Sequence, residues 1–85
     1  MEAFQQALHI NPEDAEAWNN LGTDYGRTEQ TTKAIEAFQQ ALRINPEDAK
    51  VWSNLGIAYR KADQSAKAIE AFQQAVRAQA KMVPT

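Results

Sequence analysis

The stretch Trp-Asn-Asn-Leu-Gly-Thr-Asp-Tyr at residues 18–25 decides the fold of this chain, because it returns as Trp-Ser-Asn-Leu-Gly-Ile-Ala-Tyr at residues 52–59. The segment Glu-Ala-Phe-Gln-Gln-Ala-Leu occurs at residues 2–8 and again at 36–42, and a third copy that ends in Val occupies residues 70–76. Each copy follows the previous one by 34 residues. A fixed period of this length is typical of an array in which small supersecondary units stack on their neighbours.

Each period contains two amphipathic segments. In the first, the repeated residues are spaced i, i+3, i+4 and i+7 and therefore share one face of a helix; they are Trp18, Leu21, Gly22 and Tyr25. The second segment, residues 31–44, has the same spacing at Ala34, Ile35, Phe38, Ala41 and Leu42. We expect both segments to be helices that pack against each other through these faces.

Short polar stretches separate the helical segments. Thr31 is the expected N-cap of the second helix, and Asp48 is the expected N-cap of the next one. Pro46 disfavours helical geometry at the residue before it, which ends the second helix. Gly22 and Gly56 lie inside helices, where glycine costs about 1 kcal/mol relative to alanine. We expect each of them to allow close approach of the paired helix, opposite a bulky Phe.

The spacing of these residues resembles the tetratricopeptide repeat signature. The first full unit carries it as Trp18, Leu21, Gly22, Tyr25, Ala34, Phe38, Ala41 and Pro46, and the second as Trp52, Leu55, Gly56, Tyr59, Ala68, Phe72 and Ala75. Residues 1–14 resemble the latter half of a preceding unit. The resemblance therefore covers about two and a half repeats.

The resemblance implies an all-α fold, in which tetratricopeptide-type helical hairpins stack as a short right-handed α-solenoid. Five helices are expected, at residues 2–10, 15–28, 31–44, 49–62 and 65–81. The corresponding organisation is a truncated preceding repeat and loop (1–14), a first repeat (15–48), a second repeat (49–82) and a tail (83–85).

The chain departs from the family pattern at three places. Glu29 and Asp63 stand in the short hairpin turns where the family usually has Gly, so we expect these turns to be less tightly capped. Asp24 replaces an alanine that the second repeat keeps as Ala58. The second repeat lacks the terminal Pro, so its last helix is expected to continue to about Lys81.

The composition excludes several function classes. A chain of 85 residues forms one domain at most and leaves little room for an enclosed active site. A net charge of −2 argues against nucleic acid or an anionic membrane as partner, because both bind clustered Lys and Arg. There is no cysteine, and the one histidine, His9, is expected to be a solvated residue at a helix end. We predict no enzymatic activity, no cofactor and no metal site.

No apolar run is long enough to cross a bilayer, and no segment resembles a signal peptide. The sequence therefore assigns no compartment, and the cytoplasm is the default expectation.

The family resemblance implies a binding surface for a protein or peptide partner. In stacked hairpins, the residues of the first helices that point away from their partners line the concave face. Here they are Glu16, Asn19, Asn20, Thr23 and Arg27, followed by Lys50, Ser53, Asn54, Ile57 and Lys61. The row is polar and differs between the copies, except that Asn20 and Asn54 correspond.

An asparagine amide can bond both polar groups of an extended peptide backbone, and members of the family with the Trp-x-Asn-Leu-Gly pattern grip peptides with such a ladder. The alternative is that Asn20 and Asn54 hydrogen-bond between adjacent hairpins or face water. A carboxylate clamp, as in cochaperone domains of the family, is disfavoured because Asn19 and Thr23 stand where it needs Lys and Asn.

The alternative function is self-assembly through the ends of the stack. The face of the first helix that carries Phe4, Ala7 and Leu8 lacks its hairpin partner, and the face of the last helix with Ile69, Phe72 and Val76 expects a following hairpin. A closed dimer through like ends is favoured over end-to-end growth. A third interpretation is an excised or engineered fragment, such as a substrate-recruiting segment of a larger enzyme, since the chain starts within a repeat.

Overall fold

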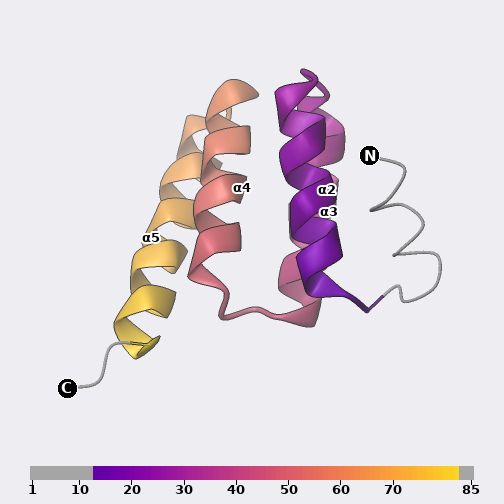
Figure 1. Cartoon of the computed structure of the whole chain (residues 1–85). Helices are drawn as coiled ribbons and strands as arrows, with labels where there is room; N and C mark the ends of the chain where they lie inside the picture. The colour runs from indigo at the N-terminus through magenta and orange to yellow at the C-terminus, as the bar shows by residue number, and fades with distance from the viewer. Residues whose placement is uncertain (1–12, 83–85) are drawn as a thin grey trace.

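The computed structural model describes residues 13–82 as four helices (Figure 1). They are α2 (Ala15–Arg27), α3 (Thr31–Ile44), α4 (Ala49–Lys61) and α5 (Ser65–Met82). Both ends of each of these four helices lie within one residue of the predicted ends, and the all-α class is confirmed. The fifth predicted helix, at residues 2–10, and the tail lie outside the described residues.

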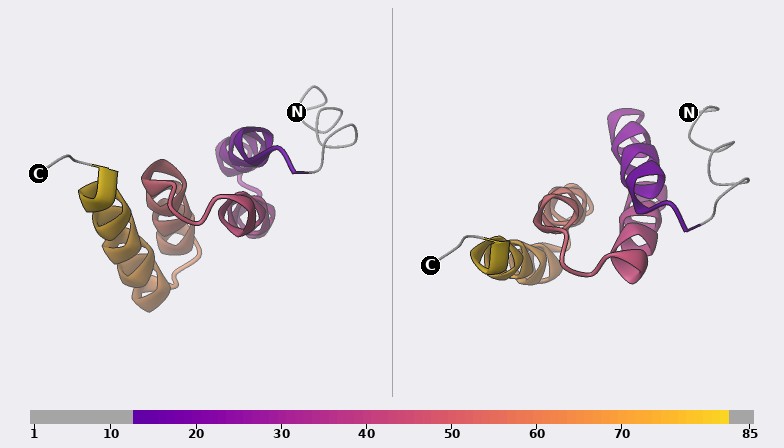
Figure 2. Two further views of the ribbon diagram at one scale, coloured as in Figure 1. Left: turned by 90° about the horizontal axis from the view of Figure 1, so that it is seen from below. Right: turned by 60° about the horizontal axis from the view of Figure 1, so that its bottom comes forward.

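The helices form two hairpins, α2 with α3 and α4 with α5, and α3 packs against α4 to join them. Figures 1 and 2 show α4 between α5 and the first hairpin, so that the chain advances one hairpin at a time. The molecule measures 39 × 31 × 16 Å. A helix with its side chains has a diameter of about 10 Å. The shortest dimension, 16 Å, is therefore that of a layer of paired helices. No helix within residues 13–82 is long and apolar enough to span a membrane.

Aspartates cap the first helix of each hairpin. The Asp14 carboxylate accepts a hydrogen bond from the Ala17 amide at 3.1 Å, and the Asp48 carboxylate accepts from the amides of Lys50 and Val51 at 3.1 and 3.4 Å. The prediction for Asp48 is confirmed. These carboxylates also lie at the positive end of the helix dipole, which adds to the stabilisation.

The prediction that Thr31 caps α3 is wrong. Thr31 is the first residue of the helix, and Gln30 stands at the N-cap without a side-chain hydrogen bond. The cause is the turn before it, because the Gln30 amide is already bonded to the Tyr25 carbonyl at the end of α2, at 2.8 Å. The helix therefore begins directly after Gln30, and Thr31 falls inside it.

The turns inside the hairpins are fully bonded, which corrects the expectation of looser capping. Glu29 adopts φ 63° and Asp63 adopts φ 59°, both in the left-handed region. With this backbone, the Gln30 amide reaches the Tyr25 carbonyl and the Glu29 amide reaches the Gly26 carbonyl at 3.4 Å. This is the Schellman arrangement, and the second hairpin repeats it. The missing glycines therefore leave backbone strain rather than missing hydrogen bonds.

The core lies where the two hairpins meet. Phe38 of α3 is only 4% exposed and packs in one cluster with Val51, Leu55 and Ala58 of α4. The expected close approach is confirmed, because a Cβ added to Gly22 would lie 2.6 Å from the Phe38 ring. Large aromatic residues border this core.

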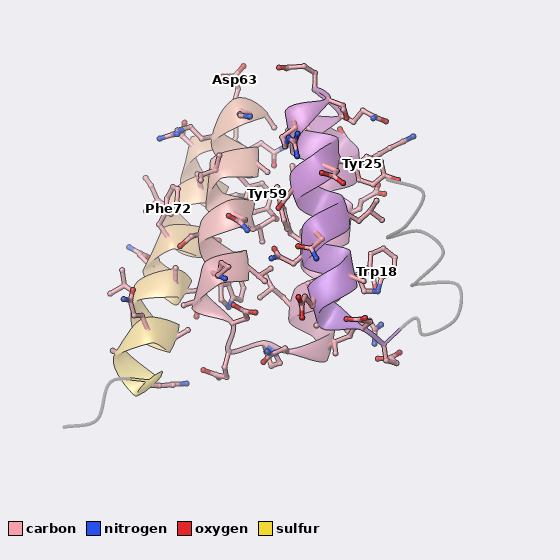
Figure 3. The ribbon with its side chains drawn as sticks, in the orientation of Figure 1. Trp18, Tyr25, Tyr59, Asp63 and Phe72 are labelled. Atoms are coloured by element: carbon pink, nitrogen blue, oxygen red, sulfur yellow. The ribbon has the colours of Figure 1, made fainter. Side chains whose placement is uncertain are left out.

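Four aromatic residues at repeat positions are half-buried and pack against the buried core residues, namely Trp18, Tyr25, Trp52 and Tyr59. In Figure 3, Trp18 and Tyr25 lie on the side of the first hairpin that faces away from α4. Trp52 and Tyr59 also form hydrogen bonds with neighbouring residues. The Trp52 Nε1 donates to the Pro46 carbonyl at 2.9 Å, and the Tyr59 hydroxyl accepts from Gln39 at 3.1 Å. Within residues 13–82, the aromatic residues at the repeat positions therefore contribute to the packing of the helices.

Candidate functional site

A groove opens between the two hairpins, where the C-terminal halves of α2 and α4 lie near each other. Its volume is about 170 Å³, and we call it the α2–α4 groove. The floor is formed by Ala34 and Phe38 of α3 together with small residues of the flanking helices. The α2 side contributes Gly22, Thr23, Gly26 and Arg27, α3 adds Thr31, and the α4 side contributes Asn54, Ile57, Ala58 and Lys61.

Half of the residues predicted for the binding surface converge on this groove. They are Thr23, Arg27, Asn54, Ile57 and Lys61. Helix geometry explains the grouping, because positions four apart on α2, and positions three and four apart on α4, lie on one side of a helix. Ile57 is 39% exposed, so part of its aliphatic side chain faces solvent at the groove.

The other predicted residues lie away from the groove. Lys50 and Ser53 line a separate hollow at the other end of α4, next to Asp48 and Gln79 of α5. Glu16 is exposed in the first turn of α2. Asn20 is half-buried and belongs to neither hollow.

Asn54 makes a hydrogen bond between the hairpins. Its Nδ2 donates to the Oδ1 of Asn19 at 3.1 Å, so that α4 is tied to α2 through two side chains. The alternative interpretation, an inter-hairpin bond, therefore describes Asn54, although the partner on α2 is Asn19 and not its repeat equivalent Asn20. The bond uses one of the two N–H groups of the amide.

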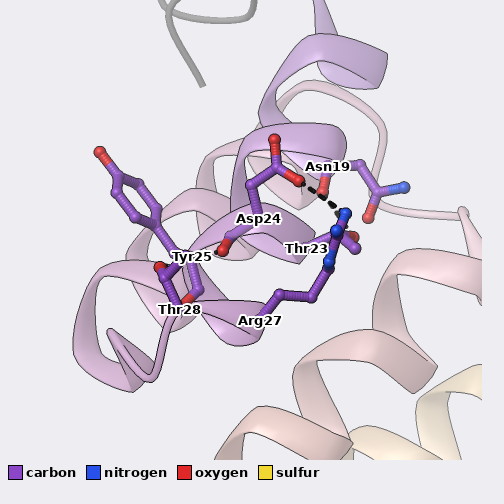
Figure 4. A network of polar contacts seen from close by, with 6 residues as sticks. All are labelled: Asn19, Thr23, Asp24, Tyr25, Arg27 and Thr28. Atoms are coloured by element: carbon purple, nitrogen blue, oxygen red, sulfur yellow. Dashed lines mark hydrogen bonds and ion pairs between the residues drawn. The ribbon is translucent and has the colours of Figure 1, made fainter.

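Polar contacts link the side chains on the side of α2 that borders the groove (Figure 4). Arg27 Nη1 donates to Asp24 Oδ1 at 3.3 Å, and the Thr28 hydroxyl donates to the Asp24 carbonyl at 3.1 Å. The Thr23 hydroxyl donates to the backbone carbonyl one turn earlier, at 3.1 Å. The Arg27 side chain is nevertheless 77% exposed, so its guanidinium remains accessible at the rim. Asp24, which departs from the family pattern, is thus a partner of a groove residue.

The sequence analysis did not predict the small, uncharged residues of the groove. Gly26, Thr31, Ala34 and Ala58 line the groove but carry no charge and no large group. One signal was available, because the residue that corresponds to Gly26 in the second repeat is Arg60. A glycine that appears in only one copy is not required by the repeat itself.

No cluster of three His, Cys, Asp or Glu residues that could hold a metal ion occurs among residues 13–82, and no polar or charged residue in this range is buried. His9 lies outside the described residues. The groove offers apolar surface, positive charge and hydrogen-bonding groups.

The proposed self-association residues are placed only in part. On α5, Ile69 is 58% and Val76 is 69% exposed, while Phe72 is half-buried with its ring against Gly56. Phe4, Ala7 and Leu8 lie outside the described residues.

These features define a class of protein, namely a stack of helical hairpins with an open groove between neighbouring units. The sequence model of the tetratricopeptide repeat family matches residues 13–81, and the chain belongs to this family. Stacks of this family serve as scaffolds for protein–protein interaction. Residues 1–12 fall outside the match.

Comparison with curated proteins gave no match. Among solved structures, a crystal structure of MamA superimposes with a TM-score of 0.91 at 28% identity, over 95% of this chain and 47% of that chain. A structure of MamA from residue 41 to the end, from Desulfovibrio magneticus RS-1, gives a TM-score of 0.90 at 30% identity, over 95% and 46%. The chain thus spans less than half the length of these neighbours.

Proposed function

We propose that this chain binds an extended segment of a partner protein in the α2–α4 groove. One observation carries the proposal: five residues predicted independently of the structure converge on a groove whose floor is apolar and open. A site of this kind gains affinity by burying one or two apolar side chains, and its polar rim fixes the orientation of the ligand.

Hydrogen bonding supports an extended backbone as the ligand. Asn54 lies at the groove and keeps one N–H and its carbonyl oxygen in addition to the bond with Asn19. Thr23 lines the same groove from α2, and its hydroxyl, which donates to the Asn19 carbonyl, can still accept a hydrogen bond. Affinity is expected to be weak, because two hairpins present a small area and association costs several kcal/mol of lost freedom.

The proposal is tested by screening the 85-residue chain against a peptide array and titrating a selected peptide into the ¹⁵N-labelled protein. We expect amide shifts at Thr23, Gly26 and Ile57, and none at Glu36 or Glu70 on the outer sides of α3 and α5. Shifts confined to the outer helices would contradict the groove as the binding site.

Single replacements then test the asparagine prediction. Asn54→Ala should weaken binding, and the matched variant Asn20→Ala, which lies away from the groove, should change it little. If Asn20→Ala weakens binding as much as Asn54→Ala does, the ladder is the better description. Unchanged affinity in both variants, with the fold intact, would rule out a role for either amide.

A second candidate function, self-association, is supported by the outer side of α5. Ile69 and Val76 correspond to Ile35 and Leu42 of α3. Leu42 is buried in one cluster with Val51 and Leu55 of α4, and Ile35 packs partly buried against this cluster. The same side of α5 is largely exposed within the described residues. An exposed apolar stripe of this kind marks an interaction surface.

The most favourable partner for this stripe is the same stripe of a second copy. Addition of another chain at its α2 end would require a free face at Ala17 and Leu21, the repeat equivalents of Val51 and Leu55 on α4. Both residues are only 4% exposed, so that face is already covered. A contact between the α5 helices of two chains around a two-fold axis does not require the buried face of α2.

Sedimentation at several concentrations tests the dimer. We expect the mass of the chain to rise to twice the monomer value and then to stay constant. The double variant Ile69→Lys with Val76→Lys should be monomeric, whereas Gln73→Lys, an exposed position of the same helix, should leave the dimer intact. A monomer mass at all concentrations would refute this second candidate.

A further inference from the structure

The floor of the α2–α4 groove consists almost entirely of carbon. Phe38, Ala34 and Ala58 line it, and the α2 side adds two glycines. Its volume is about 170 Å³. An apolar cavity of about 150 Å³ is large enough to hold benzene in another protein. The groove therefore has room for one side chain of about the size of leucine.

The opening of this groove depends on Gly26. A Cβ added there would meet nothing within 4 Å, whereas a Cβ at Gly22, one turn earlier, would lie 2.6 Å from the Phe38 ring. Gly22 is thus required by helix packing, and Gly26 is not. The space beside Gly26 is the part of the groove that a ligand can enter without moving the core.

The rim of the groove is cationic. Arg27 lies in the last turn of α2 and Lys61 in the last turn of α4, and both line the groove, which contains no acidic residue. Arg27 is paired with Asp24 at 3.3 Å but remains largely exposed. No ion pair of Lys61 is found within residues 13–82. The positive charge stands out because the whole chain is acidic, with a net charge of −2.

Apolar floor and cationic rim together specify a ligand. Resting on the proposed function, we propose that the bound segment is acidic and carries one large aliphatic side chain. That side chain enters beside Gly26 and covers Phe38, and an adjacent Asp or Glu of the partner lies between Arg27 and Lys61. The floor supplies the burial energy, and the cations select the charge of the neighbouring residue.

The probe is the capped peptide acetyl-Gly-Ser-Glu-Leu-Asp-Ser-Gly-amide, titrated into the ¹⁵N-labelled 85-residue chain up to about 5 mM, since weak binding in the millimolar range is expected. Its blocked ends exclude a terminal carboxylate as the recognised group. We expect progressive shifts at Gly26, Ile57 and Lys61. Replacing the peptide Leu by Ala should weaken binding about tenfold, because most of the buried apolar area is lost.

Replacing both acidic residues of the peptide by Gln should weaken binding by about two- to fivefold per charge, and replacing them by Lys should abolish it. The shifts should also shrink as the salt concentration rises, because rim charges are screened. If the Gln and Lys peptides bind as well as the acidic one, the charge preference is refuted.

Two changes in the protein test the two parts separately. Gly26→Leu places a side chain in the opening and should reduce affinity tenfold or more, and a thermal melt checks that the fold is kept, as expected for a better helix former. Lys61→Glu should abolish the preference for acidic peptides. Arg60→Glu is the matched control, because it makes the same charge change in the same turn at a residue that does not line the groove. It should retain most of the affinity.

The inference fails if the acidic peptide gives no shifts at the highest concentration, or if Gly26→Leu binds it as well as the parent chain does. The proposed function has a separate readout in the unbiased array. Peptides from the array that shift Thr23 and Ile57 without a dependence on an aliphatic or acidic residue would preserve the proposed function and overturn only this inference. Array peptides that shift only the outer helices would overturn both.

Discussion

Three helical glycines of this chain allow a sharp test of its packing. Gly22 lies against Phe38 and Gly56 against Phe72, and an added Cβ would approach the rings to 2.6 and 2.7 Å. Ordinary contacts begin at 3.4 Å, so each ring would have to retreat by about 0.7–0.8 Å. At Gly26, in contrast, an added Cβ meets open space.

The size of each effect follows from the freedom of the ring. Alanine is favoured over glycine inside a helix by about 1 kcal/mol, which is the full effect expected for Gly26→Ala. Overpacking a core costs about 1–3 kcal/mol. Phe38 is 4% exposed and held from both hairpins, so Gly22→Ala should carry the overpacking cost and lose up to about 2 kcal/mol after this gain. Phe72 is only half-buried and can move outward, so Gly56→Ala should be close to neutral.

Urea unfolding of the parent and the three variants, followed by circular dichroism, gives the free energies of unfolding. The expected order of stability is Gly26→Ala, then the parent and Gly56→Ala, then Gly22→Ala. For a chain of this size, 1 kcal/mol corresponds to a shift of about 4–8 °C in the melting temperature, well within measurement. A Gly22→Ala variant as stable as Gly26→Ala would refute the packing described here.

Three further changes probe other parts of the fold by thermal or urea unfolding. Phe38→Ala should cost about 3–5 kcal/mol, because it empties the junction of the two hairpins, and a melt that overlays the parent would contradict this placement. Glu29→Gly and Asp63→Gly should each stabilise the chain by about 0.5–1 kcal/mol by relieving positive φ. The gain should be larger at Glu29, since Asp tolerates the left-handed region better; a loss in either variant would argue against the turn geometry. Asp48→Ala should cost about 1 kcal/mol by removing the N-cap, and an unchanged midpoint would show that the cap contributes nothing.

The repeat made the helices predictable. Its period fixes which residues recur, and the i, i+3, i+4 spacing fixes which of them share a face. The contact of Gly22 with Phe38 followed from the same reasoning, because a glycine inside a helix needs a reason to be there. The helix faces and the contact of Gly22 with Phe38 are both relations within one hairpin. The sequence of a single repeat is therefore enough to predict them.

Relations between hairpins were not predictable in the same way. The partner of Asn54 on α2 is Asn19 and not Asn20, although Asn20 is the repeat equivalent. Equivalent residues face each other only if the hairpins stack without rotation or shift, and the sequence does not give the size of either. The prediction for Thr31 failed for a related reason, since the hydrogen bonds of the preceding turn decide where α3 begins.

The groove shows why departures from the repeat are informative. Its two sides come from the same segment in two successive copies, and two pairs of equivalent residues, Thr23 with Ile57 and Arg27 with Lys61, line it from opposite sides. The core positions of the segment are indeed shared. The polar Thr23 corresponds to the apolar Ile57, and Gly26, which lines the groove, corresponds to Arg60, which does not. An arginine at position 26 would project from the groove wall into the open space beside it. We propose that the absence of a side chain at position 26 keeps the groove open, at a cost of about 1 kcal/mol of helix stability relative to alanine.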